Sequence, residues 1–77
     1  MPSTTVDFAN VGGEDGEVEL EWYESPLDFS VSRIWLNTDG VPGELHPDDT
    51  EFDKYHAMLL AERYEHMLGA VIDADRE

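Results

Sequence analysis

In the stretch Glu17-Val18-Glu19-Leu20-Glu21-Trp22-Tyr23, acidic and apolar side chains alternate as far as Trp22. A β-strand directs successive side chains to opposite faces, so Val18, Leu20 and Trp22 share one face and the glutamates share the other. Glutamate has a poor preference for strands, so the apolar face must set the register of the strand. The stretch therefore predicts a strand that is buried on one face only.

Flanking segments predict further strands. Residues 1–10 can form an edge strand or an extended arm, and a glycine-rich turn follows over 11–16. Residues 27–36 predict a second strand, with Phe29, Val31 and Trp35 on one side and Ile34 and Leu36 on the other. The alternation slips near Ser32 and Arg33, which indicates a bulge or a strand covered on both sides.

The β-rich region is expected to span residues 17–47, and its last part contains turn signals. Asn37-Thr38-Asp39-Gly40 predicts a turn. Residues 41–47 contain two prolines, so they form either a brief third pairing or an ordered loop.

Residues 48–73 predict one long helix, which Asp48 or Thr50 can cap. Residues 74–77 are expected to fray. The helical spacing gathers one broad apolar face, formed by Phe52, Leu59, Leu60, Tyr64, Met67, Leu68, Ala70 and Val71. The chain is thus expected to fold as a single α+β domain over residues 1–77, with a two- or three-stranded antiparallel sheet packed against this helix.

The core of so short a chain needs most of its aromatic side chains. We expect Tyr23, Tyr55 and Met58 to be the more exposed of the large residues. We expect the core to contain Trp22, Phe29, Trp35, Phe52 and Tyr64.

Little in the sequence favours catalysis or a cofactor. The chain has no cysteine, which excludes disulfides, thiolate metal sites and cysteine nucleophiles. His46, His56 and His66 recur every ten residues, but that spacing does not bring two histidines together on a helix, so no metal site is expected. There is no glycine-rich phosphate loop, no serine nucleophile motif and no basic patch for direct contact with nucleic acid. We therefore predict no catalytic residue, no metal and no cofactor.

The charge is the most informative property of the composition. Nineteen acidic residues and four basic residues give a formal net charge of −15 over 77 residues. Such an excess destabilises a compact fold by self-repulsion. Three explanations stay open: an acidic surface that docks against a basic protein surface, adaptation to a salt-rich cytoplasm where the repulsion is screened, and simple solubility.

The acidic residues of the 17–23 strand form a row. Alternate residues on a strand are about 6.7 Å apart, which is comparable to the separation of successive phosphates along a nucleic-acid strand. Like charges in a row repel one another, so a fold has little reason to build such a row for stability. The simpler explanation of the row is that it forms the solvated outer face of a half-buried strand. The candidate partner-binding residues are the three glutamates of this row together with the acidic residues that precede and follow it. They are Glu14, Asp15, Glu17, Glu19, Glu21, Glu24 and Asp28.

In size and composition the chain resembles small phage-encoded acidic inhibitors that mimic nucleic acids, including some anti-CRISPR proteins. The likeness rests on the 17–21 row, on Glu14-Asp15 and Asp48-Asp49, and on the lack of cysteine. It implies a non-enzymatic inhibitor that occupies the basic nucleic-acid-binding site of a CRISPR effector complex or a DNA-processing enzyme. The lysines and arginines that normally neutralise phosphates would then bind the carboxylates.

The alternative is a small acidic adaptor or accessory protein of a high-salt organism. The start of the chain has no secretory signal, so a cytoplasmic location is expected, in the host cytoplasm if the protein is phage-encoded. Binding to membranes or directly to nucleic acid is not expected, and a homodimer stays possible.

Overall fold

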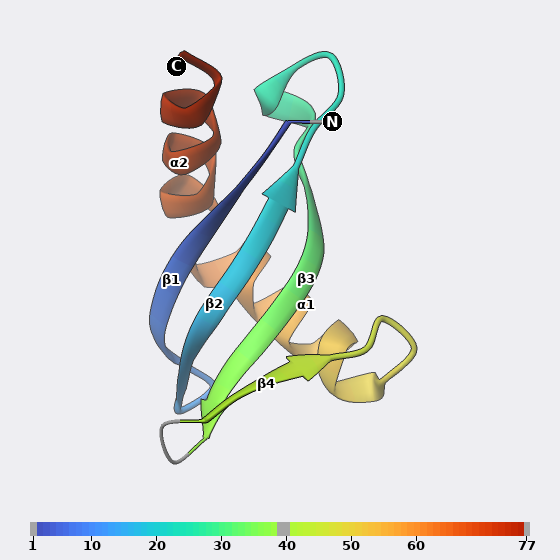
Figure 1. Cartoon of the computed structure of the whole chain (residues 1–77). Coiled ribbons are helices and arrows are strands. Elements are labelled where there is room, and N and C mark those ends of the chain that lie inside the picture. The colour runs from blue at the N-terminus through green and yellow to red at the C-terminus, as the bar shows by residue number, and fades with distance from the viewer. Residues whose placement is uncertain (1, 39–40, 77) are drawn as a thin grey trace.

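The fold is one antiparallel sheet with two helices on one of its faces. The computed structural model describes residues 2–38 and 41–76 (Figure 1). Its four strands are β1 (Ser3–Val11), β2 (Glu14–Glu21), β3 (Ser30–Thr38) and β4 (Val41–Leu45), and they lie side by side in chain order. A short 3₁₀ helix, η1 (Pro26–Asp28), connects β2 to β3, and the helices α1 (Thr50–Glu62) and α2 (Tyr64–Arg76) follow β4. The predicted α+β class is confirmed, but the sheet has four strands where two or three were expected.

At both edges of the sheet, the structure decides between the two alternatives that the sequence left open. Residues 3–11 are an edge strand paired with β2 and not a free arm. The segment after the second turn pairs with β3 as β4, which makes it the opposite edge strand. The turn predicted at residues 37–40 includes Asp39 and Gly40, which lie outside the described residues.

The turn between β1 and β2 explains the glycines of that segment. Gly12 and Gly13 both have positive φ, at 62° and 82°. A two-residue hairpin turn of this kind matches the twist of the flanking strands and favours glycine. Just before it, the register shifts between Phe8 and Val11, and Asn10 adopts φ 57°. This bulge returns the side chain of Val11 to the core, where it is fully buried.

A second bulge, at Ser32 in β3, decides which residues face solvent. Arg33 pairs with Glu19, whereas Leu20 pairs with Val31, so Ser32 is the extra residue. The bulge was one of the two readings of the slip in alternation near Ser32 and Arg33, and it is confirmed. Its effect on Trp35 was not foreseen. The bulge places Val31 on the helix side together with Ile34 and turns Trp35 to the opposite face, whereas Val31 and Trp35 were expected to share a side.

The core lies between the sheet and the helices. Tyr55 is buried, whereas exposure was expected, and Tyr64 is 43% exposed, whereas burial was expected. Trp22 and Phe52 are buried as predicted, and Phe29 packs against the edge of the core. The complete buried cluster is Phe8, Val11, Val18, Leu20, Trp22, Ile34, Phe52, Tyr55, Leu59, Met67 and Val71.

The predicted single helix over residues 48–73 is divided at Arg63. Its backbone there (φ −127°, ψ 18°) is not helical, although its N–H still donates to the carbonyl of Leu59. In a continuous helix, Arg63 would lie four residues from both Leu59 and Met67, on the buried stripe. The break removes the guanidinium from the core, because Arg63 Nη2 instead donates to the Ala9 carbonyl of β1 at 3.1 Å.

The two helix ends also correct the sequence prediction. Asp49 is the N-cap residue of α1, in place of Asp48 or Thr50, and its side chain makes no capping hydrogen bond. Residues 74–76, which were expected to fray, continue α2. There Asp75 Oδ1 accepts a hydrogen bond of 3.3 Å from the indole Nε1 of Trp22, which fastens the end of α2 to the end of β2. Neither α1 nor α2 has the length and apolar character that crossing a bilayer requires.

Candidate functional site

The face of the sheet that points away from the helices is the most charged continuous surface that the strands form. In Figure 1, α1 passes behind the sheet and α2 stands beside β1 at the left, so neither helix crosses in front of the strands. Alternation along the paired strands assigns the side chains to it. We call this surface the open face and define it by its charged and aromatic members: Asp7, Glu17, Glu19, Glu21, Arg33, Trp35 and Glu44.

One row of the open face crosses all four strands. Asp7 of β1 pairs with Glu17 of β2, Glu17 pairs with Trp35 of β3, and Trp35 pairs with Glu44 of β4. Neighbouring strands are about 4.8 Å apart, so the carboxylates flank the indole closely on both sides. Asp7, Glu17 and Glu44 are exposed, and Trp35 is partly buried.

Arg33 is the basic residue of the open face, and two strands supply carboxylates to it. Its Nε lies 3.7 Å from Glu19 Oε1 and 3.7 Å from Glu44 Oε1. Ser32, the bulge residue, donates a 2.9 Å hydrogen bond to the same Glu19 Oε1 and so fixes that carboxylate. The Arg33 side chain is 60% exposed, and ion pairs this exposed stabilise a fold by less than about 1 kcal/mol. Their main effect is to organise the charges on this face.

The structure brings some of the predicted binding residues together and separates others. Glu17, Glu19 and Glu21 lie in a row on the open face, as the alternation predicts. Glu14 does not belong to that row, because alternation along β2 places it on the helix side. Asp15 has a structural contact, since its Oδ1 accepts a 3.0 Å hydrogen bond from the bulged Asn10 N–H.

The two remaining predicted residues lie outside the sheet. Glu24 follows β2 in the loop, and Asp28 ends η1; both are exposed. The sequence reasoning missed four members of the open face. Asp7 and Glu44 were missed because the pairing of β1 and β4 was uncertain, and Arg33 and Trp35 because the bulge changes their side. The slip in alternation near Ser32 was the one available signal for the last two.

Glu14 instead contributes to the environment of a buried tyrosine. Burial raises the pKa of Tyr55 above its ordinary value of 10, and the carboxylates of Glu14 and then Glu51 raise it further. The folded state therefore keeps this hydroxyl protonated more strongly than the unfolded chain does. This contribution to stability is fully present below about pH 10 and is lost as the pH rises through the raised pKa.

The Tyr55→Phe variant is accordingly expected to lose less stability between about pH 9 and 11 than the wild type does. Urea unfolding across this pH range measures the difference. Tyr23→Phe is the matched control, because it removes the same hydroxyl from a tyrosine that is 73% exposed. An equal loss of stability with pH in the wild type and in Tyr55→Phe would contradict the raised pKa of Tyr55.

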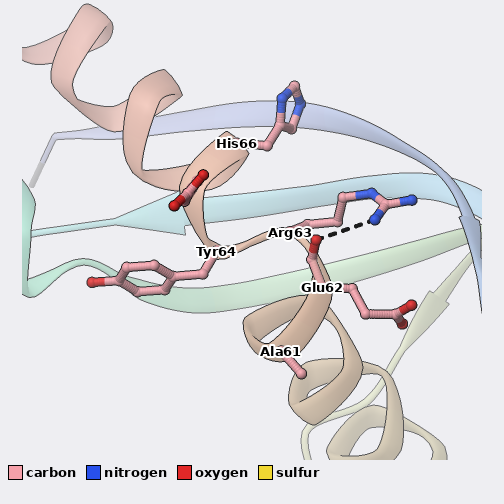
Figure 2. A pocket seen from close by; sticks show the side chains of 6 residues that line it. Ala61, Glu62, Arg63, Tyr64 and His66 are labelled. Atoms are coloured by element: carbon pink, nitrogen blue, oxygen red, sulfur yellow. Dashed lines mark hydrogen bonds between the residues drawn. The ribbon is translucent and has the colours of Figure 1, made fainter.

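The helix break forms a second candidate site, which the geometry supports less well. An open hollow of about 500 Å³ lies there, and Figure 2 shows that Arg63 and Tyr64 point in opposite directions from it. The guanidinium of Arg63 is engaged by two backbone carbonyls, those of Glu62 and Ala9. A neighbouring hollow along β1 also includes His66, whose side chain makes no hydrogen bond within residues 2–38 and 41–76. This place therefore lacks an oriented acid–base pair.

Metal binding has no support in the arrangement of side chains. Within the described part of the chain, no three histidine, aspartate or glutamate side chains converge as ligands would. The predicted absence of a metal site stays a prediction, as does the absence of a cofactor.

Comparison of the chain with protein-family models, with curated proteins and with solved structures finds no match. The open face is therefore the feature of the molecule that bears on its function.

Proposed function

We propose that the chain is a non-enzymatic inhibitor whose open face docks against the basic nucleic-acid-binding site of another protein, such as a CRISPR effector complex or a DNA-processing enzyme. The observation that carries this proposal is the composition of the open face, where an uncovered sheet surface carries five carboxylates and one guanidinium. Such a partner would place the protein in the cytoplasm of the cell that it inhibits.

The shape of this surface favours a macromolecular partner over a small substrate. The candidate hollows lie around the helix junction and β1, while the open face spans four strands and offers charge over a broad area. Small-molecule sites are concave and mostly apolar. Electrostatic complementarity over a broad face instead serves specificity and association rate between proteins.

The spacing of the carboxylates supports mimicry of a nucleic acid. Glu17, Glu19 and Glu21 follow one another on β2 at about 6.7 Å, a regular row that the sheet holds rigid. Lysine and arginine side chains that neutralise successive phosphates could bind such a row with the same salt sensitivity. The partly buried aromatic side chain of Trp35, beside these glutamates, would supply a contact area that charge alone lacks.

Arg33 competes within the chain for the same carboxylates. We expect Arg33→Gln to bind a basic partner about two- to five-fold more tightly, because it frees Glu19 and Glu44 from an ion pair worth up to about 1 kcal/mol. Calorimetric titration at moderate salt measures the change. Arg76→Gln is the matched control, because Arg76 lies at the end of α2 and removes the same charge away from the open face. Equal tightening by both variants would show that only net charge matters.

The proposal is tested by capture and competition. The immobilised protein is incubated with a bacterial lysate that contains CRISPR effector complexes, and the resin is washed at rising salt. Retention of a nucleic-acid-binding complex that added DNA then releases is the expected result. Retention that DNA does not reduce would contradict mimicry and indicate inhibition from another surface. No retention at any salt concentration would contradict the proposed function as a whole.

A second candidate function is favoured by the acidic residues of the helices. These residues are also exposed, although they lie away from the open face, and they are Glu51, Asp53, Glu62, Glu65, Asp73 and Asp75. Charge spread over every surface is what adaptation to high salt requires, and the chain would then be an accessory protein of a high-salt organism. Unfolding in dilute buffer with recovery in molar salt would support this candidate, whereas a fold that is stable in dilute buffer would contradict it.

A further inference from the structure

Trp35 is the large aromatic side chain of the open face, and the fold does not use it as core. Its indole lies on the face opposite the buried cluster, between Glu17 on one neighbouring strand and Glu44 on the other. Trp35 is only partly buried, so part of its apolar surface stays open to solvent beside carboxylates on both neighbouring strands. An aromatic ring with flanking carboxylates is the pattern that recognises an organic cation.

Arg33 shows how this surface holds such a cation. One guanidinium from β3 receives a carboxylate from β2 and another from β4, both at 3.7 Å from its Nε. Glu44 takes part in that contact and is also the direct neighbour of Trp35. Two residues further along β3, Glu17 and Glu44 flank Trp35 in the same way, with the indole at the position between them. The second position shares Glu44 with the first, has Glu17 in place of Glu19, and has an aromatic ring where the first has a guanidinium.

We infer that the open face takes an arginine side chain of its partner, with the guanidinium stacked on Trp35 between Glu17 and Glu44. This inference rests on the proposed function and adds that the partner presents arginine at the centre of its basic surface. A guanidinium within about 6 Å of the ring is attracted to its face, and its planar donors can bind a carboxylate on each side. The partner's arginine and Arg33 would then lie side by side and share Glu44.

Arginine suits this position better than lysine for physical reasons. The guanidinium is planar, weakly hydrated and able to stack while its edge donates hydrogen bonds. The lysine ammonium is compact and strongly hydrated, so it gains from the carboxylates but little from stacking. The carboxylates therefore attract both cations, and Trp35 selects between them.

Synthetic peptides test the inference directly. Alternating arginine–glycine and lysine–glycine peptides of equal length and charge are titrated into the protein, with a glutamine–glycine peptide as the uncharged reference. The wild type is expected to bind the arginine peptide about two- to five-fold more tightly than the lysine peptide. In Trp35→Thr this preference should fall to about one, while salt-sensitive binding of both charged peptides is retained.

A fluorescence titration keeps the test independent of how well Trp35→Thr folds. The chain has two tryptophans, and Trp22 is buried on the helix side. The Trp22→Phe variant therefore reports Trp35 alone, and the arginine peptide is expected to change its emission more than the lysine peptide does. The Trp35→Phe variant reports Trp22 alone and should stay unchanged.

The outcomes separate the inference from the proposed function. Equal affinity of the wild type for both charged peptides, or an arginine preference that survives in Trp35→Thr, would overturn the inference and leave the acidic docking face intact. Binding of the charged peptides no better than the glutamine–glycine peptide would overturn both.

Discussion

Replacing Asp7, Glu17 and Glu44 together by lysine should weaken binding of the captured basic partner by at least about 100-fold, because like charges across an interface cost several kcal/mol and each 1.4 kcal/mol is tenfold. These three residues are exposed and lie in the row that crosses the sheet. Surface changes of this kind usually alter stability by about 0.5 kcal/mol or less, so the variant is expected to fold. Isothermal titration calorimetry measures the affinity, and circular dichroism checks the fold.

The helices supply a control with the same change in net charge. Glu62, Glu65 and Asp73 are also exposed, but they belong to α1 and α2 on the opposite side of the sheet. Their replacement by lysine should change the affinity only a few-fold, since charges beyond about 8 Å are largely screened at physiological salt. Equal losses in the two triple variants would mean that the partner senses only net charge.

A second substitution with a large expected effect on stability is at Gly16. This residue holds the row that crosses the sheet in register. Gly16 pairs with Phe8 and with Leu36, one residue before the Glu17–Trp35 pair. A Cβ at this position would overlap the backbone carbonyl oxygen of Trp35 and approach Phe8 Cζ to 2.9 Å. A backbone atom cannot move away as a flexible side chain can, so the strand itself must shift.

Gly16→Ala is therefore expected to lower the free energy of unfolding by about 3 kcal/mol, at the upper end of overpacking effects. That is a large part of the roughly 4–12 kcal/mol expected for a chain of this length. Urea unfolding followed by tryptophan fluorescence measures the loss. Gly69→Ala provides a control of opposite sign, because a Cβ there meets open space within α2 and should stabilise the helix by up to about 1 kcal/mol. An unchanged midpoint for Gly16→Ala would refute the close approach of the two strands.

The alternation in β2 could be predicted because two local signals agreed. Each apolar residue from Val18 to Trp22 needed burial, and each intervening glutamate needed solvent. That pattern fixed the face of Glu17, Glu19 and Glu21 whatever the neighbouring strands did. Their place on an uncovered surface follows from the helices lying on one side only, which a two-layer α+β arrangement implies.

The rest of the open face could not be predicted, because it depends on non-local pairing. The side of Trp35 depends on one extra residue, Ser32, and the sequence shows only that the alternation slips there. Glu44 reaches the site because β4 pairs despite its proline, at an edge where proline is tolerated. The helix break depends on Arg63, whose guanidinium donates a hydrogen bond to the Ala9 carbonyl, 54 residues away in the chain. Local patterns cannot reveal contacts of this kind.

Carboxylate footprinting of the complex would identify the surface that the partner covers. A carbodiimide couples a small amine to exposed carboxylates, and mass spectrometry compares the labelling of each acidic residue in the free and the bound protein. We expect strong protection of Asp7, Glu17 and Glu44 on partner binding, with unchanged labelling of Glu62, Glu65 and Asp73. Protection of the helix residues, with the open face labelled as in the free protein, would contradict the claim that the open face is the docking surface.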